Sequence, residues 1–346
     1  MTATQAAPRP VTQATQSGIR AFDIARDLRP VAELIADAFA SELDERGEAA
    51  LREMRVMSRL GGVLGVLNRT TSDLQNFFGG FVWVEEGKVV GNITVQRADK
   101  FGSRFQIANV AVAPPYRGRG ISRKLMERAL AYIREQGGRW AVLQVYAHNV
   151  VARTLYDHLG FEEVGGAVDM AAERVPARWP APGSIPYFRS FSPGEWQPLY
   201  ELANTQLGAA AQWWRALRRA DFEQPLDQQM GEWMWHALGR REVYRRCIQP
   251  PGTGAGPFEA ALVLEAQRWA GRHRLQLWVR PDRYGAWEGA LLAWALAVLD
   301  DYPRWPIHIT VSKDHVAAQD ILRQAGFRPL RTLLTMRLDA ASENSN

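Results

Sequence analysis

The feature of this sequence that most constrains its fold is an approximate internal repeat. Pro30 and Pro198, Val112 and Val279, and the Gly-Phe pair at 160 and its counterpart at 326 are separated by 168, 167 and 166 residues. Because the offset drifts by only two residues over the whole unit, the sequence predicts two tandem copies of one fold. The chain has 346 residues, enough for two domains of ordinary size.

A segment rich in Pro and Gly at 175–186 separates the two copies. We expect a disordered leader at 1–18, a first domain at 19–174, a linker at 175–186, a second domain at 187–340 and a tail at 341–346. Trp213, Trp214, Trp233 and Trp235 fall on expected helices of the second domain, where we expect them to pack in a core or between the domains, with an aromatic wall of the acceptor pocket as the alternative.

The hydrophobic period of the first copy changes in a fixed order along the chain. It predicts strands at 19–24, 81–85, 89–96, 105–112, 140–146 and 161–170, with a hairpin turn at Glu86-Gly87. It predicts helices at 28–43, 48–67, 120–135 and 150–159. This order favours an α/β fold in which a mixed, mostly antiparallel sheet is flanked by helices, once in each domain.

The most informative segment is the loop between the strand at 105–112 and the helix that follows. It reads Arg117-Gly118-Arg119-Gly120-Ile121-Ser122 and opens directly into the helix. Glycines at alternate positions let a phosphate approach backbone N–H groups and a helix N-terminus. A dinucleotide-binding loop would need a third glycine at position 123, where this chain has arginine, and a Walker loop would need Gly-Lys-Ser/Thr.

This loop resembles the pyrophosphate loop of the GNAT superfamily of N-acetyltransferases, Gln/Arg-x-x-Gly-x-Gly/Ala, with Ser122 as the one departure. A second block, from Asn149 through Ala152 and Tyr156 to Gly160-Phe161, resembles the family's Asn-x-x-Ala-x-x-x-Tyr-x-x-x-Gly-Phe helix. The two blocks occur in the family's order, one helix and one strand apart.

The resemblance implies an acetyl-CoA-dependent N-acetyltransferase in which an amine attacks the thioester directly in a ternary complex. It implies that Val110, Ala111 and Val112 pair with the pantetheine arm, that Asn149 holds its amides, and that Tyr156 protonates the departing thiolate. The pyrophosphate would lie against 117–122. Many family members carry a glutamate base on the strand that enters the loop, but 104–109 contains no carboxylate. Glu85, Glu86 and His148 are candidates, and none is preferred.

The second copy has lost the corresponding chemistry. Tyr284-Gly285-Ala286-Trp287 stands where the first copy has Arg117 to Gly120, His315 replaces Asn149, and Leu322 replaces Tyr156. We therefore expect that the second domain does not bind acetyl-CoA in the usual way. Its expected role is structural or in shaping the acceptor site.

Charge and composition leave the acceptor open. The net charge of +5 suits a polyanionic ligand, and the basic cluster lies on the expected coenzyme loop, so we expect no nucleic-acid partner. We expect no membrane segment and no metal, and a monomer or homodimer. The single cysteine, Cys247, favours a reducing, cytoplasmic compartment and a buried thiol. The resemblance implies a small-molecule or peptide amine as the acceptor, and a non-catalytic acyl-CoA-binding module is the alternative function.

Overall fold

The computed structural model describes residues 17–40, 52, 79–98, 103–176, 179–206, 222, 241–250, 258–269 and 271–341. Several sequence predictions fall outside these ranges. They are the leader before residue 17, most of the helix expected at 48–67, the tail after residue 341, and Trp213, Trp214, Trp233 and Trp235.

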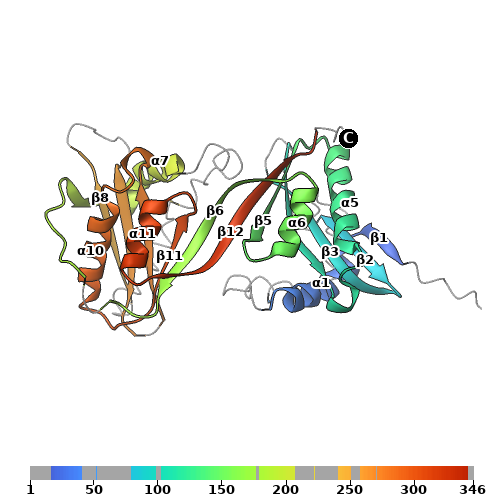
Figure 1. Ribbon diagram of the computed structural model, residues 1–346, viewed down its shortest axis with the longest axis horizontal. Helices are drawn as coiled ribbons and strands as arrows, with labels where there is room; N and C mark the ends of the chain where they lie inside the picture. Colours follow the sequence, from blue (N-terminus) through green and yellow to red (C-terminus); the bar gives the residue numbers. More distant parts are fainter. Residues whose placement is uncertain are drawn as a thin grey trace, which may run out of the picture. The chain divides into compact units, whose positions relative to one another are not determined.

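The chain divides into two compact units, which Figure 1 colours along the sequence. The first comprises Met1–Leu143 together with Arg337–Asn346, and the second comprises Gln144–Met336. Each unit is described separately below.

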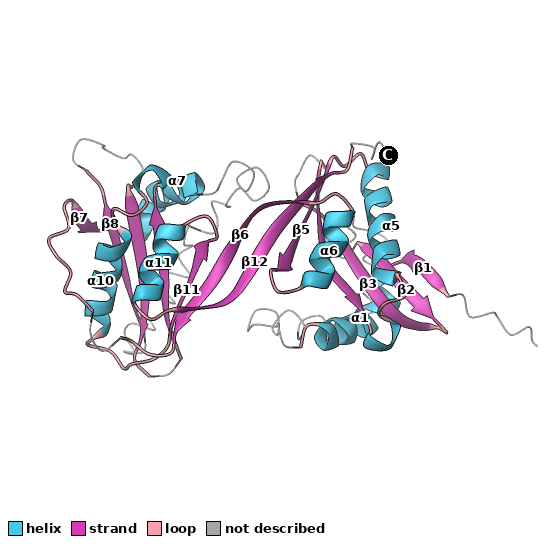
Figure 2. Cartoon of the chain, in the orientation of Figure 1, coloured by secondary structure: helices cyan, strands magenta, loops and turns pink. Residues whose placement is uncertain are grey.

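The strands of the first unit form a sheet in the order β1-β2-β3-β4-β5. Its elements, drawn by type in Figure 2, are β1 (Gly18–Ala21), α1 (Ile24–Ala38), β2 (Gly80–Glu85), β3 (Lys88–Arg97), β4 (Arg104–Val112), the 3-10 turn η1 (Pro114–Tyr116), α5 (Ile121–Glu135) and β5 (Trp140–Tyr146). Neighbouring strands are antiparallel from β1 to β4, and β4 pairs with β5 in parallel. This is the mixed, mostly antiparallel sheet predicted from the sequence.

Helices α1 and α5 pack on opposite faces of this sheet. Val31 and Ile35 of α1 share a buried cluster with Val82 of β2. The next side chain along β2, Phe81, contacts the ring of Tyr132 on α5 at 5.6 Å between centroids. Because successive strand residues alternate between faces, these two contacts place one helix on each side.

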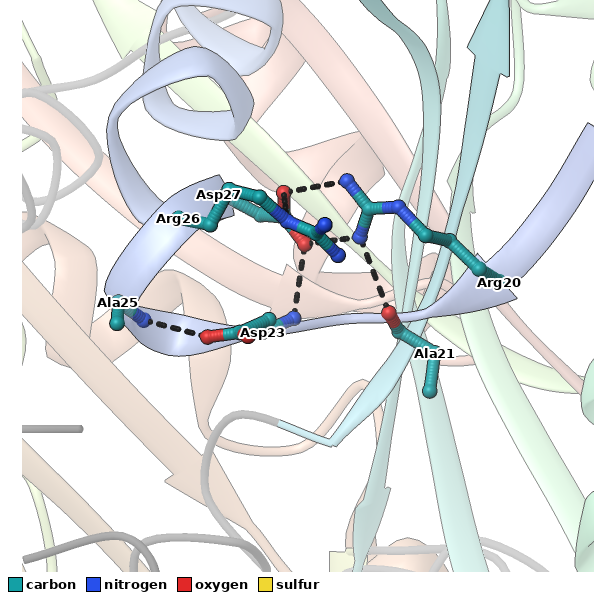
Figure 3. A network of polar contacts seen from close by, with 6 residues as sticks. All are labelled: Arg20, Ala21, Asp23, Ala25, Arg26 and Asp27. Carbon is teal, nitrogen blue, oxygen red and sulfur yellow. Dashed lines mark hydrogen bonds and ion pairs between the residues drawn. The ribbon is translucent and has the colours of Figure 1, made fainter. Parts of the chain in front are cut away.

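A buried ion pair fixes the start of α1 (Figure 3). The Asp27 side chain is fully buried and accepts a hydrogen bond from the Arg20 guanidinium, with Nη2 to Oδ1 at 2.7 Å. It also accepts one from the Asp23 backbone N–H at 2.8 Å. The Asp23 side chain in turn caps Ala25 N, so the helix begins at Ile24 rather than at Leu28 as the apolar spacing predicted.

The second unit contains the remaining strands in the order β12-β6-β11-β10-β9-β8-β7. Its elements are α6 (Val150–His158), β6 (Glu162–Ala172), β7 (Phe188–Ser190), the 3-10 turn η2 (Pro193–Glu195), α7 (Trp196–Gln206), β8 (Arg241–Ile248), β9 (Ala260–Gln267), β10 (His273–Val279), the 3-10 turn η4 (Pro281–Arg283), α10 (Glu288–Leu299), β11 (Ile307–Ser312), α11 (Val316–Gln324) and β12 (Arg328–Asp339).

The order of these elements repeats that of the first copy. The turn η1 and helix α5 begin at 114 and 121, while η4 and α10 begin at 281 and 288, an offset of 167 residues in both cases. The parallel pair β10–β11 likewise corresponds to β4–β5. The repeat read from the sequence is therefore also a repeat of structure.

The unit boundary differs from the predicted boundary at 175–186. Strand β6 belongs to the first copy by sequence, yet it pairs with β11, with Ala172 opposite Ile307 and Ala167 opposite Ser312. Ala340, the residue after β12, belongs to the second copy by sequence, yet its N–H donates to Arg139 O at 2.6 Å. Because these hydrogen bonds exchange the last strands of the two copies, the Pro-rich segment does not separate the compact units.

Candidate functional site

The loop between η1 and α5 has the geometry of an anion cradle. Gly118 and Gly120 have φ angles of +76° and +75°, in the left-handed region that favours glycine. A Cβ atom at either position would meet no atom within 4 Å. Gly120 is the N-cap of α5, and no side chain caps this helix. The first-turn N–H groups are therefore available to an anion, which the helix dipole also attracts.

Two predicted arginines brace this loop. Arg117 Nε donates to Val112 O at 3.0 Å, and Arg119 Nη2 donates to Pro115 O at 3.2 Å. The Arg119 guanidinium also lies 5.0 Å from the centre of the Tyr116 ring. Both side chains remain exposed, so they add positive potential at the loop while holding its shape.

The two residues after Gly120, Ile121 and Ser122, begin helix α5. The Ile121 side chain is only 4% exposed and packs toward the sheet, where a Cβ on Gly91 would lie 3.1 Å from its Cγ2 atom. Ser122 is half-buried. Gly91 thus lets the first turn of α5 sit close to β3, and Ile121 anchors that turn.

Strand β4 opens an edge beside this loop. Its parallel pairing with β5 runs from Arg104 opposite Trp140 to Ile107 opposite Leu143 and, among the described pairs, goes no further. Residues 108–112 therefore have β3 as a partner on one edge only. This segment includes Val110, Ala111 and Val112, whose backbone could pair with an extended ligand as an added strand would.

Asn149 and Tyr156 both lie on α6, in the second unit. Asn149 is the N-cap of this helix, and its Oδ1 accepts a hydrogen bond from Ala152 N at 3.1 Å. The side-chain NH₂ group remains as a donor. The sequence prediction started the helix at Val150 and missed this capping role, although asparagine is a common N-cap residue.

The Tyr156 phenol is 6% exposed, and its ring centre lies 5.9 Å from that of Phe161. Desolvation by burial raises the pKa of Tyr156 to about 12. No described residue hydrogen-bonds to its hydroxyl. The phenol is therefore protonated at neutral pH.

The three candidate bases have structural contacts of their own. Trp83 Nε1 donates to Glu85 at 3.0 Å, and Glu86 has a φ of +49° in the β2–β3 turn. The His148 ring stacks on Tyr146 with centroids 5.5 Å apart. None of these contacts selects one residue as the base.

Among the described residues, no cluster of three or more His, Cys, Asp or Glu side chains is arranged to hold a metal ion.

The corresponding loop of the second unit is filled by its own carboxylate. Gly285 keeps a positive φ of +88°, but Glu288 accepts hydrogen bonds from Gly285 N at 2.9 Å and from Trp287 N at 3.1 Å. His315 Nε2 lies 2.6 Å from the other Glu288 oxygen. Both side chains are 1% exposed. The N–H groups of Gly285 and Trp287, which correspond to those of Gly118 and Gly120, thus already donate to an internal carboxylate.

The pKa of Glu288 is consistent with a carboxylate that is bound by these donors. Burial by itself would raise the pKa of the Glu288 carboxyl, but hydrogen bonds from His315 and from Gly285 N–H hold the pKa below its usual value. The Tyr284 ring stacks on His315 with centroids 3.8 Å apart. His315 is the N-cap of α11 as Asn149 is of α6, and Leu322 is fully buried, as their predicted correspondence requires.

Known proteins resemble this chain over a range that includes the loop at 117–122. A model of the acetyltransferase (GNAT) family matches residues 48–161. The N-alpha-acetyltransferase MAK3 of Arabidopsis thaliana is 38% identical over 82 residues, which is 23% of this chain and 43% of that protein. N-acetyltransferase 8B of Rattus norvegicus is 31% identical over 100 residues, 28% of this chain and 45% of that protein. The chain thus spans less than half the length of these curated relatives.

Solved structures extend the likeness in fold to nearly the whole chain. A tandem GNAT protein from the clavulanic acid biosynthesis pathway aligns with a TM-score of 0.53 at 14% identity, covering 95% of this chain and all of that one. A GCN5-related N-acetyltransferase from Sphaerobacter thermophilus aligns with a TM-score of 0.52 at 18% identity, covering 93% and 96%. The fold of this chain is therefore similar to that of a tandem GNAT protein over nearly its whole length. Within the first half of the chain, residues 48–161 match the acetyltransferase (GNAT) family, as the resemblance predicted.

No helix among the described residues is long and apolar enough to cross a membrane.

Proposed function

We propose that this chain transfers the acetyl group of acetyl-CoA to a primary amine on a small molecule or peptide. The observation that carries the proposal is the cradle at Gly118 and Gly120 beside the unpaired edge of β4 at 108–112. The cradle suits the coenzyme's pyrophosphate, and the edge suits its amide-containing pantetheine arm. The names of the relatives support the acetyl group and the amine.

The proposed reaction proceeds by direct attack. The amine nitrogen bonds to the thioester carbon, the carbonyl oxygen takes the π electrons, and the intermediate collapses with cleavage of the C–S bond. In this proposal Tyr156 gives its proton to the leaving thiolate. The amine releases its proton to solvent, and the phenolate takes a proton back from solvent. Asn149 uses its free NH₂ group to hold a pantetheine carbonyl. These two roles rest on the family resemblance.

A cysteine nucleophile does not fit the described residues. Cys247 is fully buried, and burial raises its pKa to about 11. The thiolate is the nucleophilic form of cysteine, and it is a minor species at neutral pH under these conditions. Direct transfer in a ternary complex therefore remains the proposed route, in a cytoplasmic protein that works as a monomer or homodimer.

A binding module that holds acyl-CoA without turnover is the second candidate, because β4 carries no carboxylate on 104–109. Release of free thiol from acetyl-CoA, followed over a panel of polyamines, amino acids and peptide N-termini, distinguishes the two. Amine-dependent thiol release, with label from the acetyl group recovered on the amine, supports the enzyme. Tight binding of acetyl-CoA without transfer to any amine supports the module instead.

A further inference from the structure

Strand β4 contains a bulge at its open edge. Thr94 of β3 stands opposite Ala108, and Asn92 opposite Ala111, so Asn109 and Val110 together face the single residue Ile93. Asn109 has a φ of +51°, an uncommon angle that asparagine tolerates better than most residues. The bulge lies where β4 leaves β5, and bulges at such places redirect the backbone.

A buried asparagine holds this bulge. Asn92 is 1% exposed, and its Nδ2 donates to Asn109 O at 2.9 Å. Its cross-strand neighbour is Val82, which belongs to the apolar cluster beneath α1. A polar side chain in such a position destabilises the fold unless it is hydrogen-bonded. Its shorter hydrogen bond is to this backbone carbonyl and its longer one, of 3.5 Å, is to Thr94 Oγ1, which indicates that Asn92 serves the conformation of the Asn109 peptide.

The peptide that Asn92 contacts also carries the N–H of Val110. A trans peptide is planar, so a bond to the Asn109 oxygen fixes the direction of the Val110 N–H, which points the opposite way. The same bond polarises the amide and strengthens its donor. Val110 has no partner in β3, and β4 is no longer paired with β5 at this point.

We propose that Asn92 is a positioning residue for acyl transfer, which holds and polarises the Val110 N–H as the donor to the thioester oxygen. The inference rests on the proposed function. During attack the carbonyl oxygen gains negative charge, and a preformed donor stabilises that charge more than it stabilises the ground state. Asn92 itself does not touch the substrate in this proposal.

The test compares Asn92→Leu with a matched control, Thr94→Val. Thr94 Oγ1 lies 3.5 Å from Asn92 Nδ2 and 3.3 Å from Asn109 Nδ2, so its removal disturbs the same cluster without touching the Asn109 carbonyl. We expect Asn92→Leu to lower kcat by about tenfold to hundredfold, because loss of an oxyanion donor costs about 10²–10³ and here the donor is misaligned rather than lost. We expect KM for acetyl-CoA to change by less than about twofold. Thr94→Val should change neither constant.

The infrared stretch of the carbonyl in bound [¹³C]acetyl-CoA, recorded without amine, measures the same contact independently of turnover. We expect a lower frequency than in free acetyl-CoA for the wild type and for Thr94→Val, and a return toward the free value for Asn92→Leu. Asn92→Ser, whose shorter hydroxyl does not reach the carbonyl, replaces the leucine variant if circular dichroism shows that the latter is unfolded.

An active wild type with unchanged kcat and unchanged carbonyl frequency in both Asn92 variants overturns this inference and leaves the proposed function intact. A wild type that neither binds acetyl-CoA nor transfers its acetyl group overturns both. A loss of kcat equal to that of Thr94→Val also overturns the inference, because the effect would then belong to the polar cluster as a whole.

Discussion

The loops at 117–122 and 284–289 follow equivalent 3-10 turns and precede equivalent helices, yet they satisfy their backbone donors differently. In the first, two left-handed glycines leave the start of α5 uncapped and open to solvent. In the second, Trp287 replaces the second glycine, and the carboxylate of Glu288 occupies the donors from within. Neither helix has a side-chain cap, so the difference lies in the loop before the helix. The loop N–H groups of the second copy already have the carboxylate of Glu288 as their acceptor, whereas no side-chain acceptor stands at the corresponding position of the first copy, which is Ile121.

The largest expected effect comes from giving the first loop the residue of the second. Gly120→Trp places a side chain on a backbone with φ of +75° and in the space where a pyrophosphate would approach. We expect acetyl-CoA affinity to fall by at least about hundredfold, since the ligand loses backbone hydrogen bonds to a charged group. Isothermal titration measures the dissociation constant.

The matched control for that variant is Gly137→Trp. Gly137 is exposed, has a φ of +71° and lies just beyond the other end of α5, where an added Cβ atom would meet no atom within 4 Å. Its replacement carries the same backbone strain without reaching the cradle. Equal loss of affinity in the two variants would refute the placement of the pyrophosphate at Gly120.

The second-largest effect is on stability. Glu288→Ala removes the acceptor for Gly285 N and Trp287 N and leaves His315 buried without its partner. We expect a loss of about 3–5 kcal/mol in the free energy of unfolding of the second unit, as for other broken buried pairs. Urea unfolding followed by tryptophan fluorescence measures this loss of stability. The affinity for acetyl-CoA should not change. Glu127→Ala, which breaks the exposed pair with Arg123, is the control and should cost less than about 1 kcal/mol.

Glu288 also predicts a direction for the pH dependence of stability. Its folded pKa lies below its unfolded value, so its stabilisation is present above the unfolded pKa and is lost as pH falls through the folded pKa. The wild type should therefore lose stability in acid faster than Glu288→Gln, which cannot titrate. Parallel acid-unfolding curves for the two proteins would show that Glu288 is not an ionised anion in the fold.

This contrast also shows what the sequence could and could not predict. The period of the apolar residues gave β5 at its observed limits, and the constant offset gave the correspondence of Gly118 with Gly285. The exchange of β6 and β12 was missed, because an apolar strand does not encode which of two similar partners it pairs with. The role of Glu288 does not follow from the residues that the second loop has lost, because it depends on a residue that this loop has gained. An acid at the first helical position was the available signal.

A smaller effect on catalysis is expected at the position where the copies have tyrosine and leucine. Tyr156→Phe keeps the ring against Phe161 but removes the buried proton donor. We expect kcat to fall about hundredfold, within the usual range for loss of a general acid, with little change in KM for acetyl-CoA. Steady-state thiol release measures both constants. Leu322→Phe, at the buried counterpart in the second copy, should leave the acetyl-transfer rate unchanged. A wild-type kcat in Tyr156→Phe would remove the phenol from the mechanism.

The smallest expected effect concerns the loop charge. Arg119 stands where the second loop has Ala286, and its exposed guanidinium already rests on Tyr116 and on Pro115 O. Because an exposed charge acts through water and is screened by salt, Arg119→Ala should weaken acetyl-CoA binding only about twofold to fivefold, within about 1 kcal/mol. The difference from wild type should shrink as salt rises from about 50 to about 500 mM, since the Debye length falls below the distances over which such a charge acts. A difference that persists at high salt would mean that Arg119 contacts the phosphate directly. The first loop would then bind its anion with side-chain charge as well as with backbone amides, whereas the second loop binds Glu288 with the backbone amides of Gly285 and Trp287.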